Sequence, residues 1–202
     1  TGRRFGIVAY VHLAKDVEHT RQLLDRHAEA ADDRLRGVRM ILNHHPSNPD
    51  LTWPQVERGD FVCDPVFAES IALMGERGLS FDLQCNPHQL VDAAKTLAGH
   101  PNTPVIIDHL ASFHDGEDDD YPQIWREGLQ ALAAVPHVYL KLSMLFFCGG
   151  AYHEDAAREA KVRDLVLEAI DIFGTTRCMF ASNYPVDRLQ GFDIATLYGH
   201  FV

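Results

Sequence analysis

Polar and charged side chains recur near the ends of short apolar segments in this sequence. Arg39 lies inside one such segment, Gln84 ends a second and His109 ends a third. A guanidinium can clamp a substrate carboxylate through two hydrogen bonds, and a neutral imidazole can bind a metal or hydrogen-bond a substrate carbonyl. For Arg39 the alternative is an internal salt bridge, because a charge in a buried strand is costly unless it is paired. Gln84 is open to substrate contact or to a structural role.

A lysine and a serine repeat this arrangement further along the chain. Lys141 and Ser143 alternate with leucines, so both polar side chains share one face of a predicted strand. They indicate either a substrate contact or a structural polar network, and a Schiff-base lysine is a further alternative. Asp108 directly precedes His109. Because neighbouring strand residues point to opposite faces, we expect Asp108 to point away from His109 and to be structural.

The segments that must position these groups alternate between strands and helices. An amphipathic helix is predicted between each pair of consecutive strands, and the one over residues 154–173 has the clearest apolar face. Parallel strands joined by single helices form right-handed βαβ units. No linker divides the chain, so residues 1–202 are predicted to form a single domain. The predicted strands are residues 5–11, 37–42, 79–84, 104–109, 138–143 and 178–182.

Two architectures fit this order of elements, an open doubly wound sheet and a closed barrel. The sequence lacks the G-x-G-x-x-G and P-loop motifs that would favour the open sheet. Polar residues at nearly every strand end favour the barrel, because barrel enzymes build their sites at the carboxyl ends of all their strands. The α/β fold is therefore predicted to be a (β/α)8 TIM barrel with six βα units present.

Five strings of residues resemble the amidohydrolase superfamily, in the branch that holds lactonases and the pyrone-dicarboxylate hydrolase. They occur in the family's order and span nearly the whole chain. On the family fold the six strands correspond to the third through eighth, so the first two strands and their H-x-H motif are absent here. We therefore expect the natural protein to be longer at its N-terminus. The strings are 36–39 (RGVR), 79–84 (LSFDLQ), 105–110 (VIIDHL), 139–143 (YLKLS) and 179–187 (MFASNYPVD).

The last string departs from the family pattern. The family usually carries Ser-Asp-x-Pro there, and that Asp is the general base and a metal ligand. This chain has Ser182, Asn183, Tyr184 and Pro185 instead. An amide cannot accept a proton near neutral pH, and it is a poorer ligand for a hard cation than a carboxylate. Asp187 is the nearest candidate to replace the missing carboxylate.

The resemblance implies hydrolysis of a small lactone or a related carboxylated or sugar-derived substrate. In this hypothesis Arg39 anchors the substrate, His109 polarises its carbonyl, and Asn183 and Asp187 position or activate the attacking water. The cofactor is expected to be none, or alternatively one divalent metal such as zinc. The alternatives are a metal-dependent decarboxylase of the same superfamily and a catalytically silent, metabolite-binding barrel. The catalytic candidates are His109, Asn183 and Asp187, and the substrate-binding candidates are Arg39, Gln84, Lys141, Ser143 and Tyr184.

Composition restricts the partners of this chain. The net charge is -11, with 29 acidic against 18 basic residues, which argues against nucleic-acid binding. No apolar run approaches the length of a membrane span. The four cysteines form no C-x-x-C pair, and free thiols are typical of the cytoplasm. We expect a cytoplasmic enzyme whose partner is a small-molecule substrate, with a homo-oligomer left open.

Overall fold

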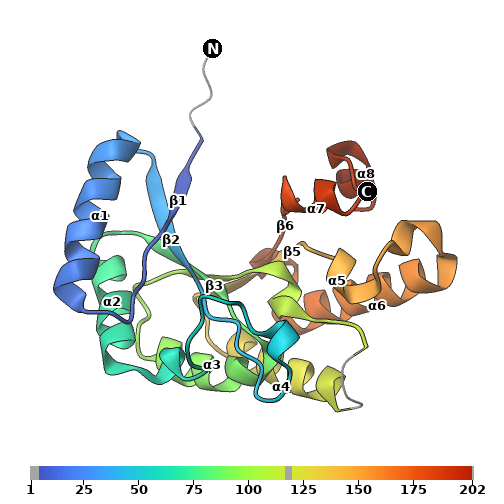
Figure 1. Cartoon of the computed structure of the whole chain (residues 1–202), viewed down its shortest axis with the longest axis horizontal. Helices are drawn as coiled ribbons and strands as arrows, with labels where there is room; N and C mark the ends of the chain where they lie inside the picture. Colours follow the sequence, from blue (N-terminus) through green and yellow to red (C-terminus); the bar gives the residue numbers. More distant parts are fainter. Residues whose placement is uncertain (1–4, 117–119, 202) are drawn as a thin grey trace.

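Six parallel strands form one curved sheet in the computed structural model, which describes residues 5–116 and 120–201 (Figure 1). Every strand pairs in parallel with the next strand of the sequence. This confirms the predicted number of strands and their order. The strands are β1 (Ile7–Tyr10), β2 (Leu35–Ile41), β3 (Ser80–Gln84), β4 (Val105–Ile107), β5 (Val138–Leu142) and β6 (Cys178–Phe180).

A long helix separates each pair of consecutive strands. These five helices lie on the outer, convex side of the sheet, which follows an arc from β1 to β6 (Figure 1). The curvature is that of the predicted barrel, with six βα units present. The long helices are α1 (Val17–Ala31), α2 (Pro65–Glu76), α3 (Leu90–Ala98), α4 (Tyr121–Ala133) and α6 (Ala156–Phe173), and the short ones are α5 (Phe146–Gly149), α7 (Val186–Leu189) and α8 (Ile194–Gly199).

Local sequence signals set where these helices begin and end. The Asp16 carboxylate accepts a hydrogen bond from the backbone of His19 and caps α1. Asp64 caps α2 in the same way, with Pro65 in the first turn, where a missing N–H costs nothing. Gly174 ends α6 with a φ of 79°, a conformation that glycine adopts without steric cost. No helix among the described residues is long and apolar enough to cross a bilayer.

The two faces of the sheet differ in chemistry. The outer face carries apolar side chains such as Val38, Phe81 and Leu140, which are completely buried beneath the helices. The inner face carries polar groups in aligned positions, and the register places Arg39 directly beside Asp82. Bulky apolar residues fill the interior of most barrels of this type. The charged inner face is therefore the candidate functional region of this molecule.

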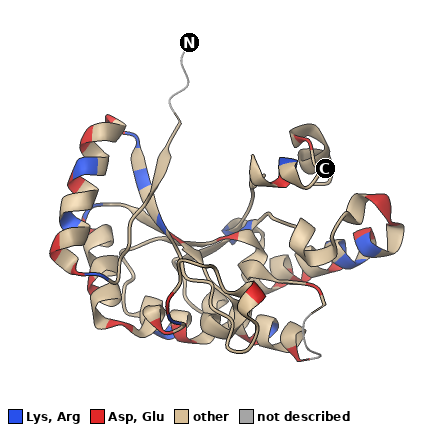
Figure 2. Ribbon diagram, viewed as in Figure 1, with Lys and Arg blue, Asp and Glu red and all other residues tan. Residues whose placement is uncertain are grey.

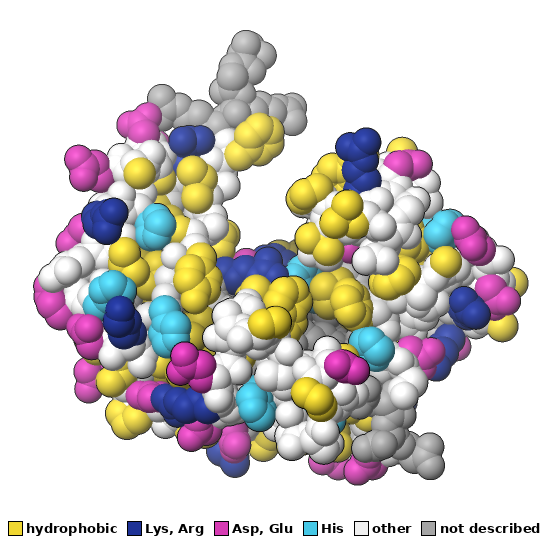
Figure 3. Space-filling view, in the orientation of Figure 1, with side chains coloured by type: hydrophobic (Ala, Val, Ile, Leu, Met, Phe, Trp, Pro, Cys, Tyr) yellow, Lys and Arg dark blue, Asp and Glu magenta, His cyan; other side chains and the backbone are white. Residues whose placement is uncertain are grey.

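The inner face is open to solvent between β1 and β6. These two strands are the edges of the sheet and are not paired with each other. Figure 3 shows a wide hollow between the part of the molecule that contains β1 and the part that contains β6, α7 and α8. Apolar side chains along both edges are exposed, among them Val8, Tyr10, Met179 and Phe180. The polar groups inside the arc can therefore be reached from this side.

Candidate active site

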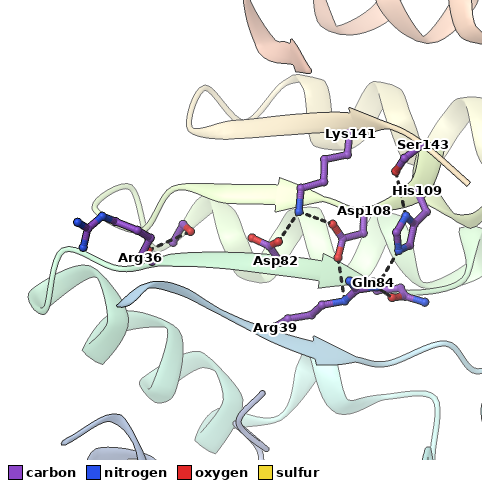
Figure 4. A network of polar contacts seen from close by, with 9 residues as sticks. Arg36, Arg39, Asp82, Gln84, Asp108, His109, Lys141 and Ser143 are labelled. Carbon is purple, nitrogen blue, oxygen red and sulfur yellow. Dashed lines mark hydrogen bonds and ion pairs between the residues drawn. The ribbon is translucent and has the colours of Figure 1, made fainter. Parts of the chain in front are cut away.

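Four ionisable side chains meet on the inner face, each from a different strand or strand end (Figure 4). Lys141 Nζ contacts the Asp82 carboxylate and lies 2.8 Å from Asp108 Oδ1. Arg39 Nε lies 3.1 Å from Asp108 Oδ2. The Asp108 side chain is completely buried, so the two cations supply the charge compensation that water cannot. Many of the other charged residues lie along the outer helices (Figure 2).

Each charge in this network changes the acidity of its neighbours. Burial, together with the neighbouring Asp108 carboxylate, raises the pKa of Asp82. Burial also acts to lower the pKa of Lys141, but the Asp108 and Asp82 carboxylates outweigh it, and the pKa is raised. Lys141 is therefore a protonated ammonium group at neutral pH. An ammonium group has no lone pair with which to attack a carbonyl, which counts against the Schiff-base alternative.

His109 is held between a hydroxyl and a guanidinium. Its Nδ1 lies 2.9 Å from Ser143 Oγ, and its Nε2 lies 2.7 Å from Arg39 Nη2. A guanidinium can only donate hydrogen bonds, so Nε2 accepts and the proton of the neutral ring is on Nδ1, which donates to Ser143. Burial and the Arg39 and Lys141 charges lower the pKa of His109 to about 3. The imidazole is therefore neutral, with its lone pair on Nε2.

A left-handed turn follows β4 and corrects one prediction. The backbone over His109–Ser112 has φ values of 59°, 49°, 54° and 55°. Strand β4 ends at Ile107, so the alternation of a strand does not extend to His109. The expectation that Asp108 and His109 point in opposite directions is therefore wrong, and both enter the same polar network. Consecutive left-handed residues other than glycine are strained, and such strain is concentrated at functional sites.

Gln84 connects this network to a cavity. Its Oε1 accepts a hydrogen bond from Arg39 Nη2. Gln84 also borders a cavity of about 220 Å³ beyond the carboxyl ends of the strands. A larger cavity of about 680 Å³ lies between α4 and α6, but none of the predicted site residues borders it. We therefore place the candidate site at the smaller cavity and the network beside it.

Two catalytic candidates that follow β6, Asn183 and Asp187, form a separate pair. Asn183 Nδ2 donates a hydrogen bond to Asp187 Oδ1 at 2.7 Å. Asp187 is buried, and this burial raises its pKa although the Asn183 hydrogen bond opposes the shift. Tyr184 is 40% exposed beside them. Within residues 5–116 and 120–201, no hydrogen bond or ion pair joins these three residues to the network, so their assigned roles remain predictions.

The structure thus brings together five of the predicted site residues, which are Arg39, Gln84, His109, Lys141 and Ser143. The sequence analysis missed Asp82 entirely as a site residue and assigned Asp108 to a structural role. The signal for Asp82 was present, because an acidic residue between Phe81 and Leu83 in a buried strand requires a cation on a neighbouring strand.

The described residues contain no cluster of metal ligands. Over these parts of the chain, no three His, Cys, Asp or Glu side chains are grouped so that they could hold a metal ion. The lone pair of His109 Nε2 faces the Arg39 guanidinium, and the Asp82 and Asp108 carboxylates are paired with cations. The described residues therefore do not form a metal site by themselves.

Comparisons with known proteins show which family this chain resembles in sequence. The model of the protein family described as Amidohydrolase matches residues 1–194 of this chain. An uncharacterized protein, y4mH, from Sinorhizobium fredii is 33% identical over 187 residues, which are 91% of this chain and 57% of that protein. An L-fucono-1,5-lactonase from Burkholderia ambifaria is 30% identical over 190 residues, which are 93% of this chain and 59% of that enzyme.

A solved structure has the same fold. It is an amidohydrolase from Burkholderia multivorans that was crystallised with bound zinc, and it is 27% identical to this chain with a TM-score of 0.76. The match covers 97% of this chain and 64% of that structure. This likeness confirms the predicted TIM-barrel fold. The chain spans between 57% and 64% of the length of these proteins.

Proposed function

Because this chain belongs to the amidohydrolase family, we propose that the protein hydrolyses a small sugar-derived lactone. The similarity to an L-fucono-1,5-lactonase supports this substrate class. The observation that carries the proposal is the neutral His109 imidazole, whose Nε2 lone pair faces the Arg39 guanidinium and whose pKa is lowered by the Arg39 and Lys141 charges. An acyl-transfer site needs this combination, because one group must accept a proton while others stabilise an oxyanion.

The reaction follows from these groups. The oxygen of a water molecule bonds to the lactone carbonyl carbon while His109 Nε2 accepts the proton that water loses. The ring C–O bond then breaks, and the ring oxygen takes that proton from Nε2, which leaves a hydroxy acid. Arg39 must release Nε2 for this transfer. Its side chain is 33% exposed, and its planar guanidinium moves as one unit, so Nη2 leaves both His109 Nε2 and Gln84 Oε1 when it reaches the substrate oxygen.

The charges around His109 make the proton transfer conditional on substrate. The free imidazole is a weak base, because burial and the Arg39 and Lys141 charges lower its pKa to about 3. An oxyanion that develops beside those cations offsets their charge and raises the pKa of His109 as the proton arrives. A resting active site therefore keeps His109 unprotonated, and the transition state makes it a stronger base.

This mechanism assigns no step to a metal ion, because the described residues provide no group of three metal ligands. A divalent metal such as zinc is the alternative cofactor, and the solved amidohydrolase with bound zinc supports it. The metal content of the purified protein, measured by mass spectrometry, distinguishes the two.

A lactone panel tests the proposal. Acid release from sugar 1,5-lactones and 1,4-lactones is followed at constant pH for the wild type, His109→Gln and His137→Gln. His137 is a matched control, because it is a partly buried histidine whose side chain contacts the Leu97 carbonyl. It directly precedes the amino end of β5, whereas the candidate site lies at the carboxyl ends of the strands. We expect His109→Gln to lose at least about 100-fold in kcat/KM and the control to keep its rate.

Three results would overturn the proposal. Equal rates for the two histidine variants would remove His109 from the chemistry. Binding of lactones without turnover would favour a silent barrel. Carbon dioxide release from a carboxylated substrate, dependent on an added metal, would favour a decarboxylase.

A further inference from the structure

The small cavity at the strand ends contains groups that the proposed reaction does not use. Asn43 comes from the loop after β2, Ser112 and His114 come from the segment after β4, and Phe147 comes from the segment after β5. The loops that follow neighbouring strands therefore converge around one space of about 220 Å³. Gln84 borders this space and also accepts a hydrogen bond from Arg39, so the cavity adjoins the catalytic network.

Three polar atoms of residues that border this cavity have no hydrogen-bond partner within the described chain. They are Asn43 Oδ1, Ser112 Oγ and His114 Nδ1, and all three atoms are buried. Asn43 is 5% exposed and Ser112 is 8% exposed. A buried polar atom without a partner costs about 1 to 3 kcal/mol, and native proteins leave few of them. Asn43 and Ser112 border this cavity and not the larger one, which His114 borders as well. These unpaired atoms indicate a place where a ligand supplies the missing partners.

The chemistry of the lining indicates which ligand fits. Among the described residues that border the cavity there is no lysine or arginine, and Asp50 contributes an acidic group at its edge. A ligand carboxylate would therefore meet no compensating charge and one repelling charge. Neutral hydroxyl groups fit, because each can both donate and accept. Trp53 and Phe147 add aromatic surface that can pack against the apolar face of a ring.

The left-handed turn places recognition next to catalysis. His109 begins the turn inside the catalytic network, and Ser112 ends it at the cavity. The indole of Trp125 donates a hydrogen bond to the Leu110 carbonyl at 2.9 Å and holds the turn in place. One short strained segment therefore fixes the distance between the proton acceptor and a substrate-recognition group.

We propose that this cavity is the subsite for the hydroxylated part of the substrate ring, and that Asn43, Ser112 and His114 select neutral hydroxyl groups over carboxylates. The inference rests on the proposed lactone hydrolysis, which it deepens by naming the substrate class. The substrate carbonyl then lies toward Gln84 and Arg39, and the hydroxylated carbons lie in the cavity.

Binding can be measured without catalysis, because the cavity contains its own reporter. The chain has two tryptophans, of which Trp125 is completely buried and Trp53, at the cavity, is 40% exposed. A methyl pyranoside, which has no lactone bond, is titrated while tryptophan fluorescence is recorded. Loss of the signal in Trp53→Phe identifies the reporter. Pyridine-2,4-dicarboxylate, a ring of similar size with two carboxylates, is titrated in parallel.

Ser112→Ala is the decisive variant, with Ser47→Ala as the matched control from an exposed loop position. Because the Ser112 hydroxyl has no partner among the described residues, its loss is expected not to lower the melting temperature, and to weaken pyranoside binding about 5- to 10-fold. Ser47→Ala is expected to bind as the wild type does. Equal affinities of the Ser112→Ala variant and the wild type for the pyranoside, or tighter binding of the dicarboxylate, would overturn the subsite.

Kinetics separate this inference from the proposed function. Ser112→Ala is expected to raise KM for a sugar 1,5-lactone about 5- to 10-fold with kcat retained, and to leave δ-valerolactone, which lacks hydroxyl groups, unaffected. Equal losses on both lactones would refute hydroxyl recognition while lactone hydrolysis stands. Pyranoside binding that depends on Ser112 without turnover of any lactone would support the subsite and refute the proposed function.

Discussion

Replacing Asp108 by asparagine tests whether the charges of the inner face form one coupled network. Asp108 is completely buried and contacts both Lys141, at 2.8 Å, and Arg39, at 3.1 Å. The amide has nearly the same shape but no charge. The variant therefore leaves two cations with Asp82 as the single remaining carboxylate of the group, and one positive charge becomes uncompensated.

The magnitude follows from the exposure of the partners. Removing one member of a fully buried ion pair costs about 3 to 5 kcal/mol. The side chains of Lys141 and Arg39 are 21% and 33% exposed, so solvent screens part of the uncompensated charge and the lower end applies. We expect Asp108→Asn to lose about 3 kcal/mol in the free energy of unfolding, which is a fall of roughly 6 to 12 °C in Tm for a protein of this size.

Chemical denaturation of the wild type and the variant measures this loss, with Asp92→Asn as the control. Asp92 pairs with Lys95 on the surface, where both side chains are more than half exposed, so its loss is expected to change the free energy of unfolding by less than about 0.5 kcal/mol. A second variant that also carries Lys141→Met removes the uncompensated charge and is expected to recover part of the stability. If Asp108→Asn is as stable as the control, the coupled network is refuted.

Two further predictions concern titrating groups. Burial and the Arg39 and Lys141 charges lower the pKa of His109 to about 3, far below its ordinary value of 6.5, so the unfolded chain binds one more proton between these two pH values. The free energy of unfolding is therefore expected to fall by about 1.4 kcal/mol per pH unit as the pH drops from 6.5 towards 3. The His109→Gln variant is expected to lose this pH dependence. A denaturation series that is parallel for the wild type and the variant would contradict this. Asn183→Asp replaces an amide that lies 2.7 Å from Asp187 by a second carboxylate, so the variant is expected to lose about 1 to 3 kcal/mol at pH 7 and to regain it below pH 5. A stability at pH 7 equal to that of the wild type would show that the two side chains do not meet.

The order of strands could be predicted from local patterns, because apolar runs and amphipathic helices are written in consecutive residues. The helix caps at Asp16 and Asp64 were readable for the same reason. The inner-face network was only partly predictable. It depends on the register between strands, which brings Arg39 beside Asp82 although 43 residues separate them, and no local pattern encodes that alignment.

The segment after β4 shows a second limit of sequence reasoning. Left-handed backbone is usually signalled by glycine, whereas His109–Ser112 contains none. The prediction therefore extended the strand through His109 and separated it from Asp108. The cavity beside this turn could not be predicted for a related reason. Asn43 and Ser112 border the same cavity only because the loops after different strands fold together.

The central claim is that a neutral His109 accepts the proton of the attacking water, and the pH profile of kcat/KM for a sugar lactone tests it most directly. This quantity reports the ionisation of the free enzyme. Since burial and two nearby cations lower the pKa of His109 to about 3, the account predicts no loss of kcat/KM as the pH falls through 6.5. A profile that halves near pH 6.5 in the wild type, and loses that inflection in His109→Gln, would contradict it.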